Sequence, residues 1–227
     1  MDTSRDCYTF PANNWVCTPY LSDYSEEITT QLTEHVWITV VSVLLGAVIA
    51  FPLALLARRS AGAAGLVLGT STVLYTIPSL AMFSLLLPFT GISPRTVVIG
   101  LALYTLTILV RNILAGLNAV PDDVLEAGRG LGYGPAKLLL RVELPLALPV
   151  IMAGVRVATV STVALVTVGA IVGSGGLGKL LLLAIDSDFK AQIFTASVLC
   201  VLLAIAFDVL LLGAQRLLTP WQRARVG

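Results

Sequence analysis

Five apolar runs, separated by short polar segments, follow one another along the chain. They occupy residues 36–56, 66–88, 96–117, 146–172 and 193–215. The hydrocarbon core of a bilayer is about 30 Å thick, and a helix needs about 20 apolar residues to cross it. Each run is long enough, so the pattern predicts five transmembrane helices. The further run 180–185 is too short to cross and is expected to lie in or near the interface.

Composition agrees with this pattern and excludes other classes of protein. Of 227 residues, 57% are hydrophobic and 12% are charged, whereas soluble domains carry about 45–50% apolar and about 25% charged residues. The net charge of +1 provides no basic field for nucleic acid. One histidine, His35, and three cysteines leave no ligand set with the usual spacing for a metal. We therefore predict an integral membrane protein that binds neither metal nor nucleic acid.

The positive charges at the ends of the runs predict the orientation, because the cytoplasmic ends of transmembrane helices carry an excess of Lys and Arg. An outside amino terminus places nine basic residues inside: Arg58, Arg59, Arg111, Arg129, Lys137, Arg141, Arg216, Arg223 and Arg225. It leaves four outside: Arg5, Arg95, Lys179 and Lys190. The opposite orientation inverts this ratio. We therefore predict an amino terminus outside and a carboxyl terminus inside.

Three regions follow from this topology. Residues 1–34 form an acidic external arm without the apolar stretch of a cleavable signal peptide, residues 35–217 form the transmembrane domain, and residues 218–227 form a cytoplasmic tail. Cys7 and Cys17 would then lie in an oxidising compartment, and turn-favouring residues lie between them. We predict a disulfide between them; the alternative is two free thiols on a mobile tail.

The longest polar segment between the runs is the predicted cytoplasmic loop, residues 118–145. Pro121, followed by two aspartates, is typical of a helix start, because proline suits the first helical position and acids favour the positive end of the helix dipole. Three glycines within 130–134 predict a turn, and Pro135 starts a second helix that runs to Pro145. From these features alone, an amphipathic hairpin that lies on the membrane is an equally good interpretation.

A spaced set of residues in this loop resembles the EAA loop of bacterial ABC importer permeases, whose usual form is E-A-A-x(3)-G-x(9)-I-x-L-P. The residues that carry the likeness are Glu126, Ala127, Gly128, Gly132, Val142, Leu144 and Pro145. Gly128 replaces the second alanine and Val142 replaces isoleucine, while the spacing is intact. The likeness agrees with the predicted cytoplasmic position of the loop.

Segments outside the loop extend this likeness. They are YTIPSLAMF (75–83), LVRN (109–112), LPLALPVIMAGVR (144–156) and GAIVGSGGLG (169–178). Together they look like the quaternary-amine osmoprotectant permeases, which serve the uptake of glycine betaine, choline or carnitine, and the likeness covers residues 35–213. The EAA loop fits permeases for methionine or a sulfonate equally well, so another small solute is the alternative cargo. A membrane scaffold without a transport role is a third interpretation.

The resemblance implies an all-α, five-helix type I ABC importer permease in the bacterial inner membrane. Two permease subunits would pair, two cytoplasmic ABC ATPase subunits would dock, and an external binding protein would deliver substrate. This chain would hold no cofactor and no ATPase site, since the partner subunits would use ATP and Mg. Glu126, beside Ala127, would be the polar contact with the ATPase. Gly132 would make the tight turn, and Leu144–Pro145 would link the loop rigidly to the fourth span.

Two charged residues lie inside predicted spans, Arg156 in the fourth and Asp208 in the fifth. Charges at membrane depth are expected to have a partner or a water path. Arg156 follows Pro145 by 11 residues and Asp208 precedes Arg216 by 8, so the two lie at comparable depth. We predict an ion pair that fixes the helix register; the alternative is a direct contact with substrate.

The second predicted span contains Pro78, which interrupts the backbone hydrogen bonds of a helix. Proline is tolerated in a membrane helix where neighbouring groups satisfy the freed carbonyl. Tyr75, Thr76 and Ser79 supply an aromatic face and hydroxyls around it. With Asn112 at the end of the third span, these residues are predicted to form the translocation path or its gate, and a harmless kink is the alternative.

The segment GSGGLG, residues 173–178, matches the spacing of nucleotide-binding loops but lacks their context. A Rossmann loop follows a strand, and a Walker A loop has Ser or Thr after its lysine. Here an apolar helix is predicted before the segment, and Leu180 follows Lys179. We expect a flexible external turn whose glycines let helices pack closely.

Overall fold

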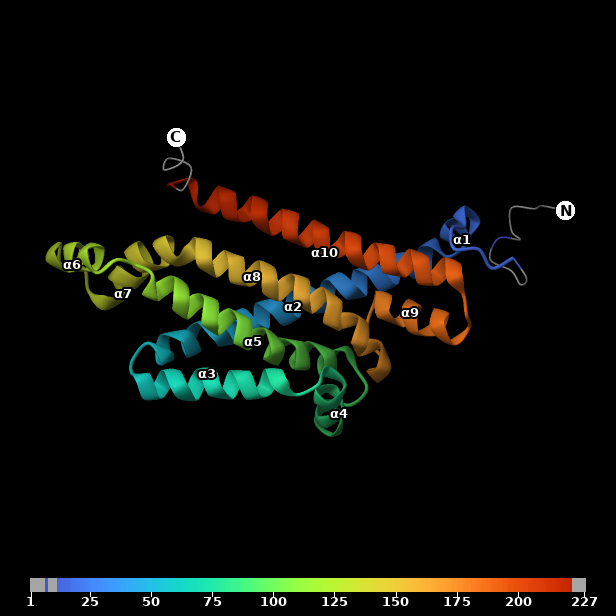
Figure 1. Ribbon diagram of the computed structural model, residues 1–227, viewed down its shortest axis with the longest axis horizontal. Coiled ribbons are helices and arrows are strands. Elements are labelled where there is room, and N and C mark those ends of the chain that lie inside the picture. The colour runs from blue at the N-terminus through green and yellow to red at the C-terminus, as the bar shows by residue number, and fades with distance from the viewer. Residues whose placement is uncertain (1–6, 8–11, 222–227) are drawn as a thin grey trace. The chain divides into compact units, whose positions relative to one another are not determined.

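The computed structural model describes Cys7 and residues 12–221, and every regular element in these residues is helical, which confirms the all-α prediction. The helices are α1 (Thr18–Asp23), α2 (Ser25–Ala57), α3 (Ala61–Thr76), α4 (Ser79–Thr90), α5 (Pro94–Asn118), α6 (Asp122–Gly130), α7 (Pro135–Leu138), α8 (Leu144–Val166), α9 (Leu177–Asp186) and α10 (Lys190–Leu218) (Figure 1). A π-helical turn, η2 (Leu139–Glu143), joins α7 to α8, and a 3-10 helix, η3 (Thr167–Val172), continues α8. Parts of two predicted regions lie outside the described residues: 1–6 and 8–11 of the arm, and 222–227 of the tail.

Four helical segments of the described chain are long and apolar enough to cross a membrane: α2, α5, the continuous run Pro135–Val172 and α10. A fifth crossing exists if α3 and α4 count as one span, but these two helices are bent by 98° at a short break. The predicted second span, 66–88, is therefore not one straight helix. Pro78 lies at the break because it has no N–H to donate and disfavours helical backbone at the residue before it.

The first apolar run belongs to a longer helix than its hydrophobic residues indicate. α2 begins at Ser25, whereas the apolar run begins at residue 36. Glu26 and Glu27 lie in the first turn of α2, where they favour the positive end of the helix dipole. Residues 25–34 of the predicted arm are therefore helical and continuous with the first span.

The chain forms two compact units. Unit 1 comprises Met1–Leu44, Ile77–Ala102 and Thr159–Ala206, and unit 2 comprises Leu45–Thr76, Leu103–Ala158 and Phe207–Gly227. The helices α2, α5, α8 and α10 each contribute residues to both units. The predicted loop 118–145 belongs wholly to unit 2.

Small side chains allow close helix packing in unit 2. Ala50 and Ala54 of α2 are fully buried in one cluster with Leu109 of α5 and Ala147 of α8. A Cβ added at Gly116 of α5 would lie 3.0 Å from the carbonyl oxygen of Ala147. Membrane helices approach one another through such small residues. This packing holds α8, and with it the segment that precedes α8, against α2 and α5.

In unit 1 the glycine-rich turn after η3 is tightly packed against α2. A Cβ added at Gly176, whose φ is +51°, would lie 2.6 Å from Cβ of His35. The Ser174 hydroxyl donates to the Glu34 carboxylate at 2.6 Å, and His35 Nε2 lies 3.0 Å from the carbonyl oxygen of Val163. The glycines therefore allow close packing, as predicted. The turn itself is packed against α2, whereas a flexible turn was expected. The element before it is a helix, not the strand of a nucleotide-binding loop.

Candidate coupling hairpin and intramembrane ion pair

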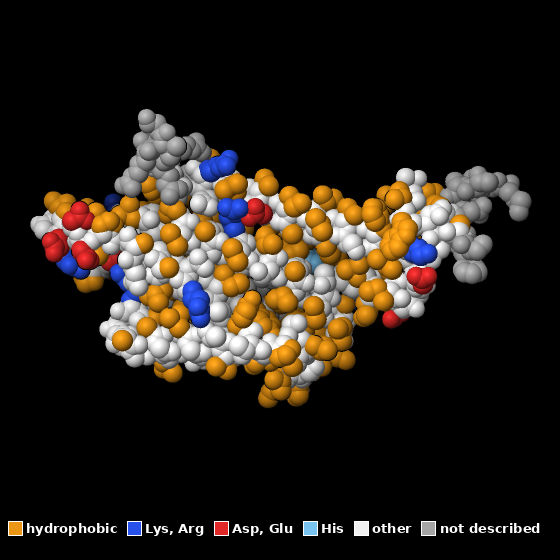
Figure 2. Space-filling view, viewed as in Figure 1, with side chains coloured by type: hydrophobic (Ala, Val, Ile, Leu, Met, Phe, Trp, Pro, Cys, Tyr) orange, Lys and Arg blue, Asp and Glu red, His pale blue; other side chains and the backbone are white. Residues whose placement is uncertain are grey.

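The predicted cytoplasmic loop forms a helical hairpin (residues 118–145), which we call the coupling hairpin after the role predicted for it. α6 begins at Asp122, one residue later than predicted, with Pro121 as its N-cap in extended backbone and Asp122 and Asp123 in its first turn. The side chains of Leu125 in α6 and Leu138 in α7 are buried together. In Figure 2 acidic and basic side chains gather over α6. The hairpin therefore has its own small apolar core beneath a charged surface.

The motif residues divide between the surface and the core of the hairpin. Glu126 and Ala127 are exposed on α6. Gly132 has φ +77°, a backbone conformation that favours glycine, and lies in the turn between α6 and α7 with open space around it. Gly128 is buried, and a Cβ there would lie 2.6 Å from Cδ1 of Leu138. The glycine at the second alanine position of the motif thus lets the two helices of the hairpin approach.

The second helix of the hairpin was predicted to end at Pro145, but in the structure it continues into α8. The segments α7, η2 and α8 form one run, with Leu144 and Pro145 in the first turn of α8. The N–H of Leu144 bonds to the carbonyl of Leu139, five residues back, as in a π-helix. Because Pro145 cannot donate to the carbonyl four residues before it, the wider turn accommodates the proline without ending the helix. The hairpin and α8 are therefore linked by continuous helix.

An ion pair that the sequence analysis did not predict ties this helix to the end of α2. The guanidinium of Arg58 donates to the carboxylate of Glu143. The side chain of Glu143 is 10% exposed and that of Arg58 is 25% exposed. From the sequence, Arg58 indicates only the orientation of the span, and Glu143 occupies a variable position of the motif. The only feature of the sequence that could indicate a role for Glu143 is its position, as a single acid one residue before Leu144–Pro145.

A cleft of about 520 Å³ opens beside this ion pair. Its lining includes the apolar residues Leu55, Leu138 and Leu139 and the basic residues Arg58, Arg59 and Arg129. Tyr133 also lines it, and the ammonium of Lys137 lies 4.0 Å from the centre of that ring. The cleft is therefore both apolar and basic.

Arg156 and Asp208 form the ion pair that their depth suggested. Nε of Arg156 donates to one carboxylate oxygen of Asp208 and the terminal NH₂ donates to the other, each at 2.8 Å. Parallel bonds of this kind fix the orientation of both groups as well as their separation. The side chains are 26% and 38% exposed, respectively. The pair links α8 to α10 within unit 2.

The five residues predicted for the translocation path do not share one unit. Tyr75, Thr76 and Asn112 belong to unit 2, whereas Pro78 and Ser79 belong to unit 1. Tyr75 is 46% exposed, and its ring packs edge-on against Tyr104, with the centroids 5.9 Å apart.

Asn112 is held at the packed contact between α5 and α8. Its amide donates to the carbonyl of Ile108 at 2.8 Å. A Cβ added at Gly154 would lie 2.6 Å from Cγ of Asn112. The role of Asn112 in a path or gate stays a prediction, since its contacts in unit 2 are those of a packing residue.

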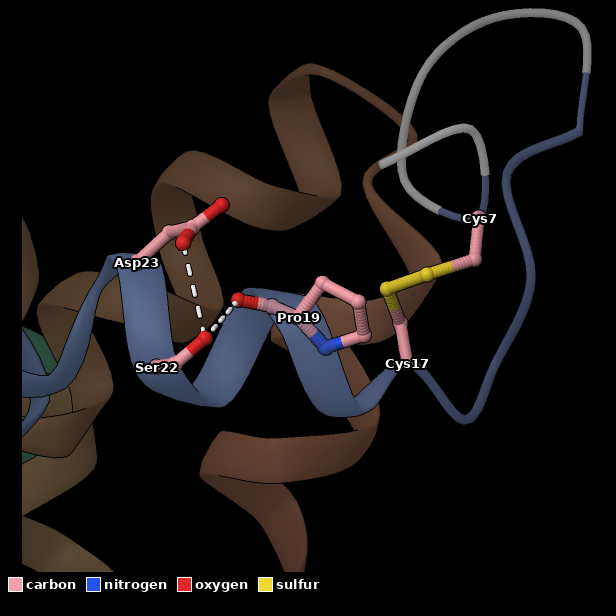
Figure 3. Close-up of a disulfide and its surroundings, with 5 residues drawn as sticks. All are labelled: Cys7, Cys17, Pro19, Ser22 and Asp23. Carbon is pink, nitrogen blue, oxygen red and sulfur yellow. Dashed lines mark hydrogen bonds between the residues drawn. A yellow bond between two sulfur atoms is a disulfide. The ribbon is translucent and has the colours of Figure 1, made fainter. Parts of the chain in front are cut away.

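A disulfide joins Cys7 to Cys17 in the arm, with the two Cα atoms 5.7 Å apart. Figure 3 shows it just before α1, where the Ser22 hydroxyl donates to the carbonyl of Pro19 at 2.9 Å. Cys17 is 6% exposed and packs in one cluster with Tyr20.

The arm is anchored to the turn between α9 and α10. The Asn13 amide donates to the carbonyl of Asp188 at 2.6 Å, and its carbonyl accepts from the N–H of Lys190 at 3.0 Å. Tyr20 is almost fully buried, with its ring 5.1 Å from that of Phe189. Burial is the main cause that raises the pKa of the Tyr20 phenol to about 12. The described part of the arm is thus packed against the turn between α9 and α10, within unit 1.

Comparison with solved structures defines the fold. The chain superimposes with a TM-score of 0.78 on an inward-facing MetNI methionine ABC transporter chain, at 22% identity, with 90% of this chain and 100% of that chain covered. An amino acid ABC transporter chain gives a TM-score of 0.72 at 19% identity, with 88% and 98% covered. The fold is therefore that of an ABC importer permease.

Sequence comparison then shows the family. The family described as binding-protein-dependent transport system inner membrane component matches residues 42–224, and the chain belongs to it. The chain is 39% identical to the osmoprotectant import permease protein OsmW of Salmonella typhimurium, over 88% of this chain and 96% of that protein. It is 33% identical to the choline transport system permease protein OpuBB of Bacillus subtilis, over 88% and 93%. The chain is thus a multi-pass inner-membrane protein.

Proposed function

We propose that this chain is the membrane-spanning permease subunit of an ATP-driven importer for quaternary-amine osmoprotectants such as glycine betaine, choline or carnitine. The observation that carries the proposal is the likeness, over almost nine-tenths of the chain, to permeases named for osmoprotectants and choline. The structural likeness to a methionine transporter supports the fold but does not bear on the cargo, because the identity is only 22%.

The coupling hairpin is the docking element for a cytoplasmic ATPase subunit in this proposal. Its exposed face carries Glu126 and Ala127, and its turn at Gly132 needs a backbone conformation that favours glycine. Two permease subunits pair, two ATPase subunits bind from the cytoplasm, and an external binding protein delivers the solute. ATP and Mg are used by the ATPase subunits, and this chain has no ATPase site of its own.

In this proposal, a movement of the coupling hairpin reaches the membrane-spanning helices through one continuous helical run. Because α7, η2 and α8 form one run, a displacement of the coupling hairpin is transmitted directly to α8. The Arg58–Glu143 pair joins the end of α2 to that run, and the Arg156–Asp208 pair joins α10 to it. Closure of the ATPase pair would therefore move three helices together between outward and inward access.

The proposal is tested by measuring which solutes the importer takes up. A bacterial strain without its own quaternary-amine importers is supplied with this chain, its ATPase and its binding protein, and the uptake of labelled glycine betaine, choline, carnitine, methionine and taurine is measured. The matched control lacks only this chain. We expect at least one quaternary amine to accumulate, and neither methionine nor taurine. Accumulation of methionine or taurine without any quaternary amine would contradict the proposed substrate class.

A further inference from the structure

The cleft beside the Arg58–Glu143 pair carries a net positive charge, because its lining contains more arginines than carboxylates. Arg58 is paired with Glu143. Arg59 and Arg129 also line the cleft, are exposed, and have no ion pair within the described residues. The lining therefore presents two guanidinium groups that are available to an anion. Planar guanidinium groups bind phosphate oxygens through paired hydrogen bonds.

The cleft lies where the apolar helices end. Leu55 is in the last turn of α2, and Arg58 and Arg59 follow directly after that helix ends at Ala57. Leu138 and Leu139, which also line the cleft, lie at the start of the run that continues into α8. A membrane span that stops at charged residues stops at the level of the lipid headgroups. Apolar residues with a basic rim at this level match a phospholipid, with its acyl chains beside the half-buried Leu55 and Leu139 and its phosphate beside the arginines.

We propose that this cleft binds the headgroup phosphate of an anionic phospholipid. Basic pockets between membrane helices are a recurrent way to hold such headgroups. The site favours an anionic over a zwitterionic lipid, because the Glu143 carboxylate is already engaged by Arg58 and no other carboxylate lines the cleft to accept an ammonium group. The bound lipid would fill the space between the end of α2 and the coupling hairpin. This inference does not depend on which solute is transported.

The test measures lipid binding to the purified full-length chain in mild detergent by native mass spectrometry. The probes are phosphatidylglycerol and phosphatidylethanolamine with the same acyl chains. The test variant is R59Q/R129Q, and the charge-preserving variant is R59K/R129K. The control is Arg141→Gln, which removes one exposed arginine of the same hairpin that does not line the cleft and is compared with the contribution of one cleft arginine. Elution volume and thermal unfolding are measured for each variant to establish that it is folded.

We expect each arginine to contribute about fivefold to phosphatidylglycerol affinity, so that R59Q/R129Q binds about 25-fold more weakly than the native chain. R59K/R129K keeps both charges but loses the planar guanidinium groups, so it should bind more tightly than R59Q/R129Q and more weakly than the native chain. The Arg141 control should bind within about twofold of the native chain. Phosphatidylethanolamine should bind the native chain more weakly than phosphatidylglycerol does. A loss of about fivefold in the Arg141 control, as large as the contribution of one cleft arginine, would overturn the proposal, since it would show attraction by net charge alone. Equal binding of phosphatidylglycerol and phosphatidylethanolamine by the native chain would overturn the proposal as well.

A second arm separates a lipid from a soluble phosphate as the occupant. Inorganic phosphate and glycerol 1-phosphate are added at millimolar concentration to the chain loaded with phosphatidylglycerol. The proposal predicts that the lipid stays bound, because the apolar walls contribute to its retention. Displacement of the lipid by either soluble anion would assign the cleft to free phosphates and overturn the lipid assignment.

Discussion

Replacement of Arg58 with alanine is expected to destabilise unit 2 far more than replacement of its neighbour Arg59. The two residues are adjacent and both follow α2, but only Arg58 is paired, with Glu143 at the end of the π-helical turn. Loss of the Arg58 side chain leaves the Glu143 carboxylate, which is 10% exposed, without its hydrogen-bonded ion-pair partner. A buried charge without a partner is costly because it has lost its hydration as well.

The magnitude follows from the burial of the pair. Removal of one partner of a fully buried ion pair costs about 3–5 kcal/mol. Arg58 is 25% exposed and borders an open cleft, so water can reach the remaining carboxylate. We therefore expect Arg58→Ala to lower the free energy of unfolding by about 2–3 kcal/mol. Arg59→Ala, at an exposed and unpaired position, should lower it by less than about 0.5 kcal/mol.

The assay is equilibrium unfolding of the purified full-length chain in mixed micelles. Glu143→Gln removes the carboxylate charge and should cost about 1 kcal/mol, the typical value of one hydrogen bond. R58A/E143Q should be more stable than Arg58→Ala alone, because it leaves no uncompensated charge. The reasoning is refuted if Arg58→Ala and Arg59→Ala lower the free energy of unfolding equally, or if the double variant is less stable than Arg58→Ala.

Three further predictions concern the hairpin, the intramembrane pair and the arm. Gly132→Val places a β-branched residue at φ +77°, so uptake should fall to background at unchanged membrane levels of the protein; normal uptake would contradict a role of this turn in docking. Exchange of the charges of Arg156 and Asp208 should restore part of the uptake that either single neutralisation removes, and an exchange no better than the worse single variant would contradict a functional pair. Cys7 and Cys17 should react with an impermeant maleimide on intact cells only after reduction; labelling without reductant would contradict the disulfide, and none after reduction would contradict an outside amino terminus.

Features that depend on local chemistry could be predicted from the sequence. The start of α6 follows from Pro121 and the two aspartates after it, and the hairpin turn follows from glycines such as Gly132. The all-α class follows from the length and hydrophobicity of the apolar runs. In each case neighbouring residues along the chain contain the information.

Features that depend on tertiary contacts could not be predicted in the same way. Arg58 and Glu143 are 85 positions apart, and nothing local to either one indicates the other. Pro145 suggested the end of a helix, but the π-helical turn before it removes the conflict with the backbone and lets the helix continue. Conversely, Pro78 suggested only an interruption, whereas the structure bends the chain by 98° there. The outcome at a proline depends on the hydrogen bonds that the surrounding fold offers to the freed carbonyl.

The central claim, that this chain carries solute across the membrane when its coupling hairpin is driven by an ATPase, is tested most directly in proteoliposomes. The purified permease and ATPase complex is reconstituted with ATP on the ATPase side and with the binding protein and labelled glycine betaine or choline on the other. The native complex should accumulate the label only with ATP. The same complex with Glu126→Lys, an exposed substitution on α6, should assemble in the bilayer but transport at background rates. ATP-driven accumulation by the Glu126→Lys complex at the native rate, or none by the native complex, would contradict the account.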